Sequence, residues 1–220
     1  MTSRTPIASR RLAAAAALFT AVALIGTACT GSQAAPSASP SSASISPSTS
    51  PTASATATPT PTASYKPADA KGRAQNVPVP VLPAVAKTKT KAGLEAFARY
   101  WFQLLSYGYE TGDTSRLTAV TSTGCRACER AKMVIKGWHE GGRWLSGGLT
   151  QTPSVSTTFR VAPDGNYQVA IQASQSAISY FNPNGTLYRS DPKPDDTGNL
   201  MLAVYRDGSW FVNNIQRIVG

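Results

Sequence analysis

The chain has 220 residues and a formal net charge of +10, but this charge is unevenly distributed. From Ala92 onward there are twelve Lys or Arg and ten Asp or Glu, so most of the basic excess lies before that residue. A near-neutral folded part needs no broad basic face, and nucleic acid is therefore not expected as a partner.

The N-terminal segment is typical of an export signal. Met1–Arg11 contains three arginines and no acid, and Leu12–Ala28 is an uncharged run of 17 residues rich in Ala and Leu. A positively charged start followed by such a run is the pattern of a secretory signal peptide. A membrane-spanning helix needs about 20 apolar residues, so the run is short for a retained span.

The motif Gly26-Thr27-Ala28-Cys29 resembles the bacterial lipobox, in which small residues precede a cysteine that becomes acylated. The resemblance implies removal of residues 1–28 and attachment of acyl chains such as palmitate to Cys29. It departs from the usual motif at Gly26, where leucine is common. Two or three chains would anchor the protein stably in the cell membrane, on its extracytoplasmic face. The alternatives are a plain secretory signal with an incidental cysteine and an uncleaved membrane anchor.

Residues 29–91 are predicted to form a disordered tether, because Ser, Thr, Ala and Pro dominate most of the segment. Such a composition cannot bury enough apolar surface to offset the entropy lost on ordering. The stretch Val77–Pro83 differs because it is apolar and extended. We expect it to pack along the edge of the domain, with a protein-docking strip as the alternative.

Residues 92–220 are predicted to form one domain that opens with three helices. Apolar residues recur at three- and four-residue spacing from Leu94 to about Tyr109, which is the stripe of an amphipathic helix. A short second helix is expected to end at Val120, and a third to cover about Cys125–Glu140. The buried faces are expected to carry Leu94, Phe97, Ala98, Trp101, Leu104 and Leu105 in the first helix, and Ala131, Val134, Ile135 and Trp138 in the third.

After Gly147-Gly148 the apolar period changes to two, which predicts strands. Five segments carry this pattern: Val155–Val161, Tyr167–Phe181, Thr186–Arg189, Leu200–Arg206 and Trp210–Ile218. In the second segment, Tyr167, Val169, Ile171 and Ala173 are expected to share one face. Helices followed by antiparallel strands predict an α+β fold, with about three N-terminal helices packed on a curved, cone-like antiparallel sheet of four to five strands.

Two stretches carry a resemblance to known proteins. Ala96-Phe97-Ala98-Arg99-Tyr100-Trp101 and Tyr107-Gly108-Tyr109-Glu110-Thr111-Gly112-Asp113 look like the nuclear-transport-factor-two/SnoaL-like cone fold. With Cys125-Arg126-Ala127-Cys128 following, the chain more closely resembles a family of actinobacterial lipoproteins whose domain has no assigned function. The resemblance covers Ala92–Gly220 and lies in order and spacing. It implies a cone whose enzymes use an Asp base, a position to which Asp113 cannot be matched.

Cys125 and Cys128 are predicted to form a disulfide. Once Cys29 is acylated they are the two remaining thiols, in an oxidising compartment, and their spacing at a helix start permits a bridge. A thioredoxin-type redox pair is the alternative. A zinc site is disfavoured because two cysteines and one histidine fall short of four ligands. We expect a structural disulfide that clamps the third helix, and no metal or cofactor.

Five residues of the folded part are candidates for lining a ligand pocket. Aromatic side chains line pockets for hydrophobic or glycan ligands, although they are more often simply core. The single histidine is also a candidate general base, but no Ser or Cys partner lies at a recognisable spacing. The candidates are Trp101, Tyr107, Trp138, His139 and Trp144.

These observations predict a cell-envelope lipoprotein whose domain binds an envelope protein, a glycan or a hydrophobic ligand without catalysing a reaction. One alternative is a small isomerase- or cyclase-like enzyme of the cone fold, which requires a buried carboxylate or His139 in an open pocket. Another is a structural component of an envelope assembly, which requires an exposed apolar patch.

Overall fold

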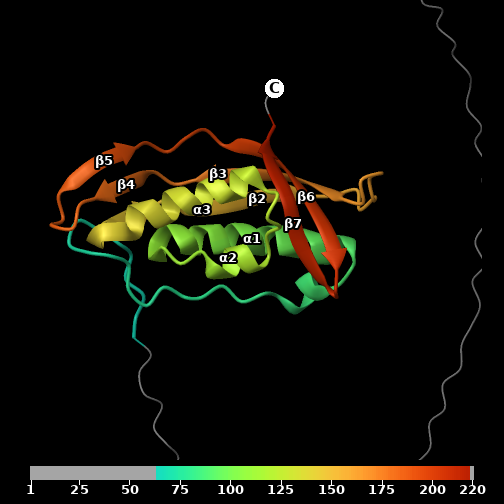
Figure 1. The fold of residues 1–220 in the computed structure, drawn as a ribbon, viewed down its shortest axis with the longest axis horizontal. Helices are drawn as coiled ribbons and strands as arrows, with labels where there is room; N and C mark the ends of the chain where they lie inside the picture. The colour runs from blue at the N-terminus through green and yellow to red at the C-terminus, as the bar shows by residue number, and fades with distance from the viewer. Residues whose placement is uncertain (1–62, 219–220) are drawn as a thin grey trace, which may run out of the picture. The chain divides into compact units, whose positions relative to one another are not determined.

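The computed structural model describes residues 63–218; the predicted leader, Cys29 and the tether before Ala63 lie outside this range. The helices are α1 (Lys91–Thr111), α2 (Ser115–Ala119) and α3 (Arg126–His139), with short 3-10 turns η1 (Ala84–Lys87) and η2 (Glu140–Gly142). The strands are β1 (Trp144–Gly147), β2 (Thr150–Ser156), β3 (Tyr167–Gln175), β4 (Ile178–Phe181), β5 (Leu187–Asp191), β6 (Thr197–Arg206) and β7 (Ser209–Arg217). The described part is therefore a mixed α+β fold, as predicted (Figure 1).

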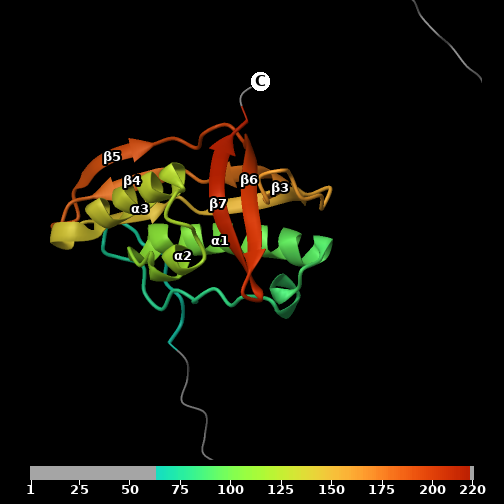
Figure 2. The same cartoon turned by 45° about the vertical axis from the view of Figure 1, so that its right-hand side comes forward.

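The seven strands of this described part form two antiparallel sheets. The larger has the order β2-β3-β6-β7 and the smaller the order β1-β4-β5. Within the larger sheet, β6 and β7 run across the direction of β2 and β3, as two views of the ribbon show (Figures 1 and 2). Helices α1 and α3 both contact this sheet, α1 mainly at β2 and α3 at β7.

Helix α1 follows its predicted stripe closely. It begins after Thr90, whose hydroxyl accepts a hydrogen bond from the backbone N–H of Gly93 at 3.0 Å, as a helix N-cap should. It ends at Gly112, which takes the left-handed conformation that glycine tolerates best. The predicted stripe is confirmed: Leu94, Phe97, Ala98, Trp101 and Leu104 are buried, and Leu105 is partly buried.

One face of the larger sheet carries the core. The predicted shared face of β3 is confirmed, since alternate residues from Tyr167 to Ala173 are buried and those between them are exposed. Met201 and Ala203 of β6 and Trp210 and Val212 of β7 continue this buried face and pack in one cluster with α1. The core therefore lies between the helices and the larger sheet.

The prediction of a single sheet of four to five strands was wrong. Trp144 and Leu145, placed in the helical half by the sequence, begin β1 and pair with β4. The predicted long strand Tyr167–Phe181 is two strands, β3 and β4, in different sheets. Gly147 permits this split: a Cβ there would lie 2.0 Å from the carbonyl oxygen of Ala177, in the short link between β3 and β4.

The predicted strand Val155–Val161 also ends early, and one helical position differs. Strand β2 stops at Ser156, and Phe159 takes a positive φ of 55°, which breaks the alternation. Val161 is consequently exposed. In α3 the predicted inner residue Ile135 is buried as expected, but Val134 is 47% exposed, and Lys132 lies on the buried face in its place.

Residues 63–91, predicted as tether, contact the domain along α1 and both sheets. The indole N–H of Trp144 donates to the carbonyl of Asp69 at 2.9 Å, and that of Trp210 donates to the carbonyl of Thr88 at 2.9 Å. Ala86 is fully buried in the main core. Apart from the packing expected for Val77–Pro83, the sequence did not predict these contacts, because backbone carbonyls such as those of Asp69 and Thr88 accept the bonds and composition does not reveal them.

No helix among residues 63–218 combines the length and the apolar character that crossing a bilayer requires.

Candidate functional site

A cavity of about 500 Å³ lies between α1, the first turns of α3 and the strands β6 and β7. Its volume falls within the range of small-molecule sites, about 300–1,000 Å³. It is lined by Trp101, Phe102, Leu105, Arg126, Ala127, Arg130, Ala131, Asn199, Asn214, Ile215, Gln216 and Arg217. Apolar side chains from the core and basic side chains from the surface thus meet in one space.

The apolar wall of the cavity is rigid. Trp101 and Phe102 are almost completely buried, and their rings meet edge to face with centroids 5.1 Å apart. The Trp101 indole N–H donates to the hydroxyl of Thr121 at 3.0 Å, and that hydroxyl donates to the Leu117 carbonyl at 2.6 Å. Satisfied buried polar groups of this kind fix side-chain orientation. The cavity wall is therefore preformed.

Two features hold the start of α3 against β7: backbone hydrogen bonds and a disulfide. The segment Val120–Ser122 runs beside β7: the N–H of Ser122 donates to the Val212 carbonyl at 2.8 Å, and the N–H of Val212 donates to the Val120 carbonyl at 2.9 Å. The disulfide between Cys125 and Cys128 then closes the first turn of α3. Arg126 and Ala127, which line the cavity, are the two residues enclosed by that disulfide.

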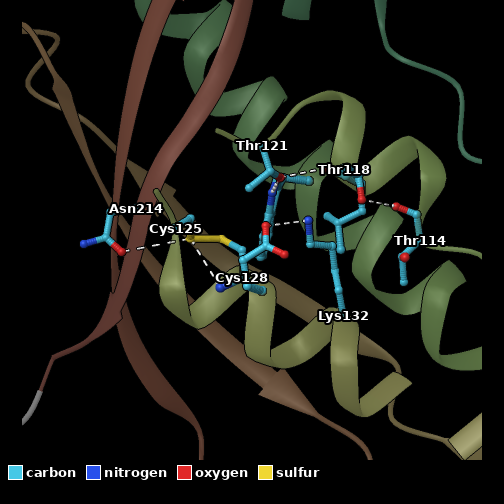
Figure 3. Close-up of polar contacts among 10 residues, drawn as sticks. Thr114, Thr118, Thr121, Cys125, Cys128, Lys132 and Asn214 are labelled. Atoms are coloured by element: carbon cyan, nitrogen blue, oxygen red, sulfur yellow. Dashed lines mark hydrogen bonds and ion pairs between the residues drawn. A yellow bond between two sulfur atoms is a disulfide. The ribbon is translucent and has the colours of Figure 1, made fainter. Parts of the chain in front are cut away.

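The predicted disulfide is confirmed, with Cα atoms 5.2 Å apart and both cysteines fully buried. Figure 3 shows it between Asn214 of β7 and Thr121. Asn214 Oδ1 lies 4.0 Å from Cys125 Sγ, a packing contact because a disulfide sulfur carries no proton. The Cys125 sulfur accepts the backbone N–H of Cys128 at 3.3 Å and so serves as the N-cap of α3. This burial supports the clamp over the redox pair, since reactive thiols are usually accessible.

Three arginines stand at the rim of the cavity. Arg126 and Arg130 lie four residues apart on α3, and Arg217 ends β7. All three are exposed, and none forms an ion pair within residues 63–218. The acid nearest in sequence, Glu129, is bound to the buried Lys132 with an N–O distance of 2.7 Å. Among residues 63–218, the rim therefore carries positive charge that no ion pair compensates.

A smaller cavity of about 180 Å³ adjoins the first and shares Phe102, Leu105 and Asn199 with it. Its remaining lining comes from Tyr109, Thr150, Ala173, Gln175, Pro194, Asp195 and Thr197. The shared residues make the apolar wall continuous along α1. The basic groups lie at the α3 end of this wall and one carboxylate, that of Asp195, at the other.

The five residues predicted to line a pocket do not come together. Trp101 lines the 500 Å³ cavity, but Tyr107, Trp138, His139 and Trp144 do not. The aromatic side chains of α3 and β1 pack in the clusters of the second sheet instead. Trp144 stacks on Phe181 with centroids 5.6 Å apart, and Trp138 packs on Tyr180 at 4.7 Å. Tyr107 lines a separate cavity of about 280 Å³ beside the Val77–Pro80 segment.

His139 has a structural place at the end of α3. Its Nε2 lies 3.0 Å from the carbonyl oxygen of Tyr109, which requires the proton on Nε2. Its ring also packs on Gly112, where a Cβ would lie 2.6 Å from the imidazole. Burial is the main cause that lowers the pKa of His139 below its usual value. The ring thus stays neutral and links α3 to the end of α1.

The arginines were not among the predicted site residues, although the sequence carries one signal for them. Arg126 and Arg130 are like charges at i and i+4 on one helix face, an arrangement that weakens a helix by about 0.2–0.5 kcal/mol. Such a pair suggests a role other than helix stability. The sequence alone could not place Arg217 near Arg126 and Arg130, because that placement depends on how β7 pairs in the sheet. Among the described residues, no group of three His, Cys, Asp or Glu side chains could hold a metal ion.

A family model matches residues 63–216. The chain belongs to DUF6318, a family of unknown function. The match begins at the first described residue, so the DUF6318 domain includes the segment before Ala92 that the sequence analysis assigned to the tether. No curated protein matches this DUF6318 chain.

Several solved structures are similar to the chain at low sequence identity. The intermembrane-space region of the chloroplast protein ARC6 is 12% identical, with 60% of this chain and 98% of that chain covered and a TM-score of 0.39. Aln2 from a Streptomyces species is 13% identical, with 62% and 94% covered and a TM-score of 0.36. An uncharacterised protein with a cystatin-like fold from Caulobacter vibrioides is 13% identical, with 58% and 89% covered and a TM-score of 0.37.

Proposed function

We propose that the chain is an exported lipoprotein, anchored through Cys29, whose DUF6318 domain binds a small ligand in the 500 Å³ cavity without transforming it. The cavity is the observation that carries this proposal. Its wall of Trp101, Phe102 and Leu105 is apolar and fixed, and its rim is polar. Such a combination is typical of ligand sites. The helices packed on the larger sheet fit the cone-like architecture of the envelope lipoproteins that the sequence resembles.

The chemistry of the lining supports binding over catalysis. The titratable side chains that line the cavity are arginines, which stay protonated at every physiological pH and so cannot exchange protons as general acids or bases. The one histidine lies outside the lining, with its Nε2 at the Tyr109 carbonyl. Carboxylates of the kind used by cone-fold isomerases do not appear among the residues that line this cavity.

The cavity can be tested with N-phenyl-1-naphthylamine, a neutral probe that fluoresces in apolar surroundings. We expect the chain from Thr30 to Gly220 to increase this fluorescence in a saturable way. Ala131→Trp fills the cavity and should abolish the increase. Met133→Trp is the matched control, because Met133 is 65% exposed on α3 and does not line the cavity. Circular dichroism would establish that both variants fold.

Two results would refute the binding proposal. One is the absence of any saturable signal with the parent chain. The other is a signal that Ala131→Trp and Met133→Trp reduce equally, since the probe would then bind elsewhere.

A further inference from the structure

We infer that the ligand of this cavity is an amphipathic anion: a molecule with an apolar body and a carboxylate or phosphate head group held by Arg126, Arg130 and Arg217. This inference rests on the proposed binding function and adds the chemical class of the ligand. The observation that supports it is that three arginines line one cavity together with apolar side chains.

The arginine cluster is a local feature of an otherwise balanced domain. From Ala92 onward the chain carries twelve basic and ten acidic residues, yet three of those twelve line this one cavity. No carboxylate lines it with them, and the described residues offer these arginines no ion-pair partner. Charge of one sign gathered in a concave site favours a ligand of the opposite sign.

The geometry of the rim suits an oxyanion in particular. Arg126 and Arg130 project from successive turns of one helix, and Arg217 reaches the same cavity from β7, so the groups approach from two elements. Guanidinium groups donate in a planar fork that matches the oxygens of carboxylate and phosphate. The N-terminal end of α3, which carries partial positive charge, lies at the same place.

The apolar wall of the cavity indicates that the rest of the ligand is an apolar tail. Trp101 and Phe102 present buried rings to the cavity, and Leu105 continues the surface toward the smaller cavity. Leu105, Ala127 and Ala131 are only partly buried, so an inorganic anion would leave their apolar surface in contact with water. A ligand whose tail lies along α1 would cover it, which contributes roughly 25 cal/mol per Å² of apolar area buried. Asp195, at the far end, is placed to disfavour a second negative charge there.

The test is calorimetric titration of the chain from Thr30 to Gly220 with four monomeric probes: decyl phosphate, decanol, decyltrimethylammonium and inorganic phosphate. Decyl phosphate has the same tail as decanol and decyltrimethylammonium, and the same charged group as inorganic phosphate. We expect it to bind at least about tenfold more tightly than the other three. The affinity should fall as salt is added, because the head group is only partly buried.

Substitutions locate the head group. Arg126→Gln, Arg130→Gln and Arg217→Gln should each weaken decyl phosphate about tenfold, the usual effect of losing a hydrogen bond to a charged group, and leave decanol unchanged. Lys136→Gln is the matched control, because Lys136 is an exposed cation of α3 that does not line the cavity. Its affinity should equal that of the parent chain.

The outcomes separate the inference from the proposed function. Equal binding of decanol and decyl phosphate, with no effect of the arginine substitutions, would leave a binding cavity but overturn the anionic ligand. Equal binding of inorganic phosphate and decyl phosphate would overturn the amphipathic class. An effect of Lys136→Gln as large as that of Arg130→Gln would reveal adsorption to surface charge and overturn the inference. Failure of all four probes, together with N-phenyl-1-naphthylamine, would overturn the binding function itself.

Discussion

A chain that begins at Ala92 is expected to be about 2–4 kcal/mol less stable than one that begins at Thr30. Removing residues before Ala92 takes away the acceptors of two indole N–H groups, those of Trp144 and Trp210. Each of these two hydrogen bonds contributes about 0.5–1.5 kcal/mol to stability. The loss of Thr90 as N-cap of α1 costs about 1 kcal/mol more, and the burial of Ala86 is also lost.

Urea denaturation followed by far-UV circular dichroism measures this difference. A chain that begins at Ala63 should unfold at the same urea concentration as the Thr30 chain, because the composition of residues 30–62 predicts a tether and the family match begins at residue 63. Equal midpoints for the Ala92 and Ala63 chains would contradict the account. They would show that residues 63–91 are a tether, as their composition alone suggests.

A pair of glycine substitutions tests the same contact in the intact chain. A Cβ at Gly93 would lie 2.2 Å from the carbonyl oxygen of Thr88, so Gly93→Ala must displace the preceding segment. Gly137, in α3, has nothing within 4 Å of such a Cβ, and Gly137→Ala should stabilise the helix by roughly 0.5–1 kcal/mol. We therefore expect Gly93→Ala to lower the free energy of unfolding and Gly137→Ala to raise it.

Cys29→Ala is expected to release the protein completely from the membrane fraction. The proposal that Cys29 carries acyl chains rests on the small residues before it and the uncharged run that precedes them. Each buried methylene contributes about 0.8 kcal/mol to membrane affinity, so two or three chains dominate the partition. Intact mass of the parent protein should show an increment of diacylglyceryl size on a chain that starts at Cys29.

The control for this experiment is Cys125→Ala/Cys128→Ala, which should leave membrane association unchanged. Membrane association that persists in Cys29→Ala, or an unmodified parent protein recovered from the medium, would refute the lipoprotein proposal. It would favour the uncleaved anchor in the first case and the plain secretory signal in the second.

The fold class and the main helix were predictable from the sequence because local physics dictates them. The stripe from Leu94 to Leu105 is long and strictly periodic, and the change of period after Gly148 marks the strands. The second sheet was not predictable, since β1 and β4 are four residues each and their pairing depends on distant contacts. A short apolar run such as Trp144-Leu145 fits a helix end or a strand equally well.

The cavity was only partly predictable for the same reason. Trp101 was chosen correctly, as an aromatic residue on the buried face of a long helix. Trp138 meets the same criterion, and Trp144 follows the end of the third predicted helix, but both belong to clusters of the second sheet, which the sequence did not predict. Arginines at a helix start resemble solvated charge until β7 brings Arg217 beside them.

The most direct test of the central claim is a map of binding by backbone amide NMR as decyl phosphate is added to the Thr30–Gly220 chain. The account predicts saturable shift changes centred on Ala127, Ala131 and Ile215, which line the cavity on its α3 and β7 sides. Amides around Trp138 and Trp144, in the second sheet's clusters, should change little. Changes centred on those clusters, or none at all, would contradict the assignment of the cavity as the binding site.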